Sequence, residues 1–108
     1  MRRFETEIEI LRARVDTIDT KLLALLNARA AVVTNIYSLK EQHGAPRFNR
    51  ARTDAILQRL VEDNQGPLTA PEVRELFLSM LQFFVQRYRA GESTAAFTAA
   101  AETSEPLR

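Results

Sequence analysis

The sequence predicts an all-α fold of three helices, of which the first is very long. Three observations predict it. Apolar residues recur at helical spacing through most of the first 40 residues, a helix-start motif at 69–72 opens a second apolar stripe, and no stretch shows the pattern of a strand. At 108 residues, 45% of them apolar, the chain has the size of one domain.

The first predicted helix runs from about residue 5 to about residue 42. Its apolar residues follow one another in alternating steps of four and three, which keeps them on one side of a helix. No Gly or Pro interrupts the pattern before Gly44, and Gly-Ala-Pro at 44–46 ends it. We call these residues the apolar seam: Phe4, Ile8, Leu11, Val15, Ile18, Leu22, Leu25, Val32, Ile36 and Leu39.

The length of this helix has a consequence for assembly. At 1.5 Å per residue it is roughly 55 Å long, whereas a compact domain of this size has a radius of gyration of about 13 Å. The helix therefore protrudes far from its own domain. We expect another chain to cover the apolar seam.

Two further helices are expected to follow. One is short and runs from about Asn49 to the stretch Glu-Asp-Asn-Gln-Gly-Pro at 62–67. The other opens with a capping box, in which Thr69 is the N-cap and Glu72 completes the motif, and it ends at about Arg89.

The segment after Gly91 differs in composition. It is rich in Ala, Thr, Ser and Glu and has little apolar bulk. We therefore expect a helical domain at residues 1–90 and a flexible C-terminal tail at residues 91–108.

Charge and composition exclude several classes of function. The chain has 15 Lys and Arg residues against 14 Asp and Glu, so its net charge of +1 draws it neither to nucleic acid nor to an anionic membrane. The absence of Cys removes disulfides and thiol chemistry, and the single His43 is expected to be solvated, so we expect no metal site. No signal peptide is evident, and no stretch approaches the ~20 apolar residues of a membrane span. We expect a soluble protein of the cytoplasm.

Three cations of the first helix are unusual in position. Arg29 occupies the place in the apolar seam that follows Leu25, where a guanidinium is costly unless its donors are satisfied. Lys40 lies eleven residues further on, hence on the same face and roughly 16 Å away. Arg12 is about 25 Å from Arg29 along the helix and about 100° around it. Only an antiparallel partner helix could bring Arg12 to the same pocket.

Each of these cations also has an ordinary interpretation. Lys40 suits the negative end of the helix dipole, Arg12 can pair with Asp16, and Arg29 can bridge to a partner's carboxylate. The arginines at 47, 50 and 52 add to the pattern, because they crowd the positive end of a helix without an acidic neighbour. Together these residues indicate a local site for an anion.

The residues "LRARVDTIDTKLLALLNAR" at 11–29, followed by Lys40, "RARTDAILQRL" at 50–60 and then "GPL" and "LF", resemble the all-helical chorismate mutases. The similarity covers residues 8 to about 89. It implies an intertwined homodimer of three-helix chains, whose two sites are each built largely in one chain and completed by the N-terminal arginine of the other.

The resemblance also implies roles for individual residues. Arg12 is the arginine that reaches the other chain's site, Arg29 and Arg47 bind the carboxylates of a small dicarboxylate substrate, Lys40 lies beside its ether oxygen, and Arg52 opens the second helix near it. Arg50 lies close to Arg47 in the sequence, which leaves open which of the two faces the site. The implied reaction is a Claisen rearrangement of an enolpyruvyl ether. This pericyclic step needs no nucleophile, metal or cofactor, so we expect none.

Four positions depart from the family pattern. Thr53 replaces the usual Glu and Asn49 stands where an acid is common, at positions that contact the substrate's ring hydroxyl in the family. On the third helix Tyr88 aligns with a Gln that shares the ether oxygen with the lysine, and Phe84 aligns with a Ser. Tyr88 can still donate a hydrogen bond, whereas Phe84 only fills space.

Three interpretations therefore stay open. In the first, the chain rearranges 4-amino-4-deoxychorismate to 4-amino-4-deoxyprephenate. In the second, it rearranges chorismate to prephenate, with isochorismate pyruvate lyase, which uses the same scaffold, as a variant. The third interpretation is a non-catalytic helical dimer that serves as a regulatory or interaction module, but an idle pocket has no reason to keep interior cations.

Overall fold

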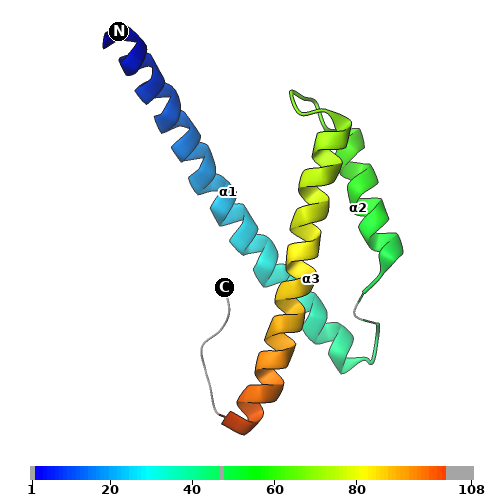
Figure 1. Cartoon of the computed structure of the whole chain (residues 1–108). Coiled ribbons are helices and arrows are strands. Elements are labelled where there is room, and N and C mark those ends of the chain that lie inside the picture. Colours follow the sequence, from blue (N-terminus) through cyan, green and yellow to red (C-terminus); the bar gives the residue numbers. More distant parts are fainter. Residues whose placement is uncertain (1, 47, 102–108) are drawn as a thin grey trace. The chain divides into compact units, whose positions relative to one another are not determined.

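The structure is a computed structural model that describes residues 2–46 and 48–101, with side chains up to residue 89. It consists of three helices, α1 (Arg2–Gln42), α2 (Arg50–Asp63) and α3 (Ala70–Ala101), as Figure 1 shows. They form two compact units, of which the first holds α1 and the second holds α2 and α3. The described residues contain no strand, so the all-α prediction is confirmed.

Helix α1 is 41 residues long and is unbroken, as the spacing of its apolar residues predicts. It begins three residues earlier than expected and ends where Gly44 adopts a φ of 66°. The backbone N–H of Ala45 donates to the carbonyl of Lys40 at 2.8 Å, and that of Gly44 donates to Glu41 at 3.3 Å. These two bonds form a Schellman motif, which requires a left-handed residue at the position of Gly44.

No residue of α1 is buried within the chain. In the apolar seam, Leu25 is 68% exposed, Ile18 61% and Ile36 44%. A long row of exposed apolar side chains is unusual for a helix that lies alone in water. These exposed fractions agree with the prediction that the chain does not cover the apolar seam by itself.

The apolar content of α1 also corrects one expectation. The helix contains an 18-residue window with a mean hydropathy of 1.4. By length and composition alone, α1 is therefore long and apolar enough to cross a membrane. The statement that no stretch approaches a membrane span is therefore wrong. Ala, Val and Leu fill positions beside the seam as well as in it, although Arg29 interrupts the stretch at 22–39. The core helix of a soluble protein meets the same criterion.

Helix α2 begins directly after Asn49, which has extended backbone angles and acts as the N-cap. The Asn49 side-chain oxygen accepts from the backbone N–H of Arg52 at 3.1 Å, and its carbonyl accepts from Thr53 at 3.1 Å. The side-chain bond satisfies the N–H of Arg52, which a helix start otherwise leaves unpaired, and the bond from Thr53 is the first regular backbone bond of the helix.

The turn between α2 and α3 is closed by side-chain hydrogen bonds. The Asn64 amide group donates to the carbonyl of Leu68 at 2.6 Å, and the Asn64 oxygen accepts from Gly66 N–H at 3.1 Å. At the start of α3, Thr69 and Glu72 form the capping box that the sequence predicts: each side chain accepts from the other's backbone N–H, at 2.9 Å and 3.3 Å.

Helices α2 and α3 contact each other along the hairpin that this turn creates (Figure 1). Arg74 of α3 donates to the side-chain oxygen of Gln58 of α2 at 3.4 Å. The described residues that are buried all belong to this second unit: Leu57, Val73, Leu81 and Phe84.

The C-terminal end of α3 differs from the prediction. The helix continues to Ala101, so the expectation that it ends at about Arg89 is wrong. Five of the seven residues at 95–101 are Ala, the strongest helix former, and one glycine at 91 costs only about 1 kcal/mol relative to Ala. The prediction weighed apolar bulk and neglected this local propensity. The rest of the predicted tail, residues 102–108, lies outside the described residues.

Candidate functional site

Arg29 and Lys40 lie on the same face of α1, because eleven residues of unbroken helix separate them. Both residues are half-exposed. The seam residues around them are more exposed, with Leu25 at 68%, Val32 at 57% and Leu39 at 56%. The structure therefore confirms that the two cations share a face and shows that they are less exposed than their apolar neighbours.

Arg12 lies on the exposed N-terminal half of α1, with 72% of its side chain accessible. Its guanidinium is 3.6 Å from a carboxylate oxygen of Glu9, so the ion pair is with the residue three positions earlier and not with Asp16. Because α1 is unbroken helix from Arg12 to Arg29, about 25 Å separates the two residues along the axis. Arg12 cannot reach the site of its own chain.

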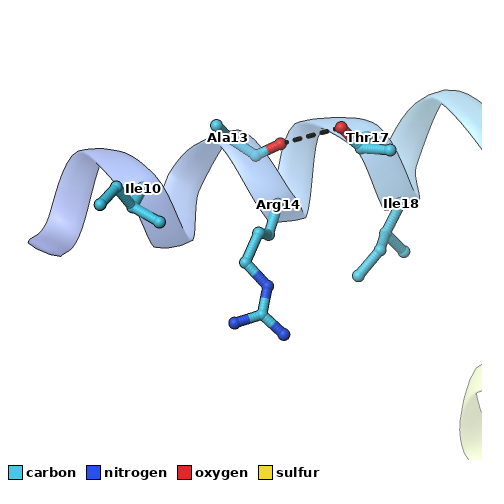
Figure 2. Close-up of a pocket in the computed structure, with 5 residues that line it drawn as sticks. All are labelled: Ile10, Ala13, Arg14, Thr17 and Ile18. Atoms are coloured by element: carbon cyan, nitrogen blue, oxygen red, sulfur yellow. Dashed lines mark hydrogen bonds between the residues drawn. The ribbon is translucent and has the colours of Figure 1, made fainter.

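A shallow depression lies on the same part of α1, and Figure 2 shows the residues around it. Within it the Thr17 hydroxyl donates to the carbonyl of Ala13 at 3.1 Å. The depression is open and consists of one helix only. It contains none of the predicted site residues, so it is not the candidate site. Its lining residues are Ile10, Ala13, Arg14, Thr17 and Ile18.

The first turn of α2 carries three of the predicted substrate-binding residues. Asn49 and Arg52 are exposed and Thr53 is half-buried. The Asn49 oxygen is used as the N-cap, so its N–H groups are the part left for a ligand. No acidic residue lies in this turn to offset Arg50 and Arg52. Arg47 lies outside the described residues, and its assignment as a carboxylate binder stays a prediction.

Phe84 and Tyr88 lie one turn apart on α3. Phe84 is 7% exposed and packs edge-on against Phe83, with ring centroids 5.6 Å apart and planes at 84°. This burial agrees with the expectation that Phe84 fills space. Tyr88 is half-buried. Its predicted role as a hydrogen-bond donor to the substrate stays a prediction.

One contact beside these residues is missing from the sequence prediction. The guanidinium carbon of Arg89, on α3, lies 4.9 Å from the centroid of the Phe48 ring, which immediately precedes the N-cap of α2. This is a cation–π geometry. No local pattern pairs two residues so far apart in the chain, so only the tertiary structure could reveal it.

The candidate residues thus fall into two groups, one in each compact unit. Arg29 and Lys40 share a face of α1, with Arg12 at a distance along it. The second unit holds the other described candidates: Asn49, Arg52, Thr53, Phe84 and Tyr88. Among the described residues, no group of three or more His, Cys, Asp or Glu side chains could hold a metal ion.

Comparison with known proteins was made by sequence and by structure. The family described as chorismate mutase type II matches residues 11–89. The bifunctional chorismate mutase/prephenate dehydratase of Pseudomonas aeruginosa is 33% identical over 82 residues, which are 71% of this chain and 22% of that protein. The T-protein of Haemophilus influenzae is 28% identical over 95 residues, which are 87% of this chain and 24% of that protein. The chain therefore spans less than a quarter of the length of either relative.

Two solved structures share the fold. The chorismate mutase of Thermus thermophilus superposes in its form I with a TM-score of 0.71 at 29% identity, over 72% of this chain and 98% of that chain. Form II gives a TM-score of 0.72 at 29% identity, over 74% and 91%. Since the family match spans residues 11–89, most of the sequence, the chain belongs to the chorismate mutase type II family.

Proposed function

We propose that the chain is a chorismate mutase-type isomerase, which rearranges chorismate or its 4-amino-4-deoxy analogue to prephenate or 4-amino-4-deoxyprephenate. The observation that carries this proposal is the placement of Arg29 and Lys40 on one face of α1, inside the segment that matches the family. The other predicted site residues lie within the same matched segment. The names of the Pseudomonas and Thermus relatives describe the same activity.

The proposed mechanism depends on positioning and charge. In the rearrangement the ether C–O bond of the substrate breaks while a C–C bond forms, and no proton has to move. The guanidinium groups of Arg29, Arg47 and Arg52 bind the carboxylates of the substrate through paired hydrogen bonds. This holds the enolpyruvyl group over the ring. The ammonium of Lys40 stabilises the negative charge that develops on the ether oxygen. An electrostatic contact of this kind is worth about 3–4 kcal/mol in other enzymes.

The proposed active form is a homodimer. All residues of the apolar seam except Ile8, which is partly buried, are exposed, and a second copy of the same seam is a self-complementary partner for it. An antiparallel partner would bring its Arg12 toward Arg29 and Lys40, which Arg12 cannot reach within its own chain. We also propose that the protein is cytoplasmic.

The hydrogen bonding of Asn49, the N-cap of α2, affects the expected preference between chorismate and its 4-amino analogue. Because the Asn49 oxygen accepts the N–H of Arg52, the amide presents its donors to a ligand. The hydroxyl on the chorismate ring can accept such a bond. The amine of the 4-amino analogue, protonated at neutral pH, can only donate. The cap therefore favours chorismate of the two substrates, while the Thr53 hydroxyl can serve either.

The proposal is tested by a spectrophotometric assay that offers chorismate, isochorismate and 4-amino-4-deoxychorismate separately. We expect turnover of chorismate without added metal or cofactor. Pyruvate release from isochorismate would identify a lyase instead, and consumption of none would favour the non-catalytic interaction module.

The substrate preference is tested with Asn49→Asp. This variant keeps an N-cap oxygen and adds a carboxylate acceptor, so it should shift the ratio of kcat/KM values toward the 4-amino substrate. An unchanged ratio would show that residue 49 does not contact the ring substituent.

A further inference from the structure

We propose that the stack of Arg89 on Phe48 is a positioning contact, which holds the first turn of α2 in place for the substrate. The inference rests on the proposed function, because it assumes that Arg52 and Thr53 in this turn meet a dicarboxylate. Neither Phe48 nor Arg89 is assigned a direct contact with the substrate.

The first turn of α2 needs such an anchor because its own charges are unfavourable. It carries Arg50 and Arg52 at the positive end of the helix dipole and has no acidic residue to offset them. The N-cap bond from Arg52 to Asn49 is exposed, and the middle and the far end of α2 are held by other contacts. The Phe48 stack is a side-chain contact, among the described residues, that joins the beginning of α2 to α3.

A short series of bonds links this stack to the candidate site. Arg89 lies 4.9 Å from the ring of Phe48, and Phe48 is bonded through the backbone to Asn49. The side chain and the carbonyl of Asn49 accept from the N–H groups of Arg52 and Thr53, each at 3.1 Å. A displacement of Phe48 therefore moves Arg52 and Thr53, which are proposed to bind the substrate.

The stack also adds a cation beside a turn that is already cationic. Phe48 is 41% exposed, so the ring offers Arg89 a face that is partly shielded from water. Without a ligand the charges of Arg89, Arg50 and Arg52 repel one another, and a bound dicarboxylate relieves this repulsion. The contact should therefore act on the affinity for the substrate more than on the chemical step.

The experiment measures KM and kcat for Phe48→Ala and Arg89→Met. An exposed cation–π contact is worth about 0.5–1 kcal/mol, so we expect KM to rise by about two- to fivefold while kcat stays within about twofold. Phe48→Trp should retain the wild-type KM, because indole is the better partner for a cation. The double variant should be no worse than either single variant, since both remove the same contact.

Arg74→Met provides the matched control, because Arg74 is also an α3 arginine that contacts α2, but through Gln58 near the other end. Its KM should equal that of the wild type. If KM is unchanged in Phe48→Ala and Arg89→Met, or rises equally in Arg74→Met, the inference is wrong although the enzyme is active. If the wild-type protein turns over none of the three substrates, the proposed function itself fails.

Discussion

Helix α1 has no buried residue of its own, whereas the hairpin of α2 and α3 has four buried apolar residues among its described side chains and a turn closed by side-chain hydrogen bonds. The two units therefore position their functional residues in different ways. In α1 the register of one continuous helix places Arg29 and Lys40. In the hairpin, caps and long-range contacts place Arg52 and Thr53. Changes in α1 should thus affect assembly and chemistry, whereas changes in the hairpin should affect its folding and the binding of the substrate.

The largest effect is expected from a charge placed in the apolar seam. Leu25 is 68% exposed in the chain, so Leu25→Asp costs little if α1 stays in water. If a second copy covers the seam, the buried carboxylate should abolish the dimer and with it the activity. Light scattering coupled to gel filtration gives the mass. Asn27→Asp adds the same charge off the seam and should leave the dimer intact; a dimer in both variants contradicts the proposed interface.

A smaller effect is expected from Lys40→Ala. Removing the cation that stabilises the ether oxygen should lower kcat by about 10²- to 10³-fold. The helix content and the dimer mass should not change, since Lys40 is not one of the apolar seam residues that the proposed interface buries. Lys21→Ala, which removes an exposed lysine of the same helix, serves as the control. A fall in kcat of less than about threefold in Lys40→Ala would exclude the proposed role.

The hairpin should respond to Leu57→Ala through its stability. Leu57 is 6% exposed in the second unit, and truncating a buried leucine costs about 2–5 kcal/mol. Urea unfolding followed by circular dichroism measures the loss. Leu68→Ala, at a residue that is 46% exposed, should cost much less. If both variants lose the same free energy of unfolding, the buried core of the hairpin contributes less to stability than the burial of Leu57 indicates.

The smallest effect is expected at the N-cap of α2. Asn49→Ala removes the acceptor for the N–H of Arg52 and should lower the free energy of unfolding by about 1 kcal/mol. Asn49→Asp should retain the wild-type stability, since Asp is an equally good N-cap and suits the helix dipole. Thermal unfolding of the wild type, Asn49→Ala and Asn49→Asp measures these differences in stability. If Ala and Asp are equally destabilising, the cap bond is not the cause.

Much of the fold and part of the site follow from local patterns. The alternating steps of four and three predict the 41-residue helix α1, and Thr69 with Glu72 predicts the start of α3. The shared face of Arg29 and Lys40 follows from the helical repeat alone. The end of α3 was also a local property, but the Ala-rich segment was judged by its lack of apolar bulk, so the prediction stopped at Arg89 instead of Ala101.

The sequence by itself determined the three helices and the face on which Arg29 and Lys40 lie, because helical periodicity depends only on neighbours in the chain. The family followed from the residue motifs within 11–89, which the family match covers. Only the tertiary structure decided that Arg74 meets Gln58 and that Arg89 stacks on Phe48. These contacts join residues of different segments. Their geometry depends on how the hairpin closes, which no spacing within a single helix specifies.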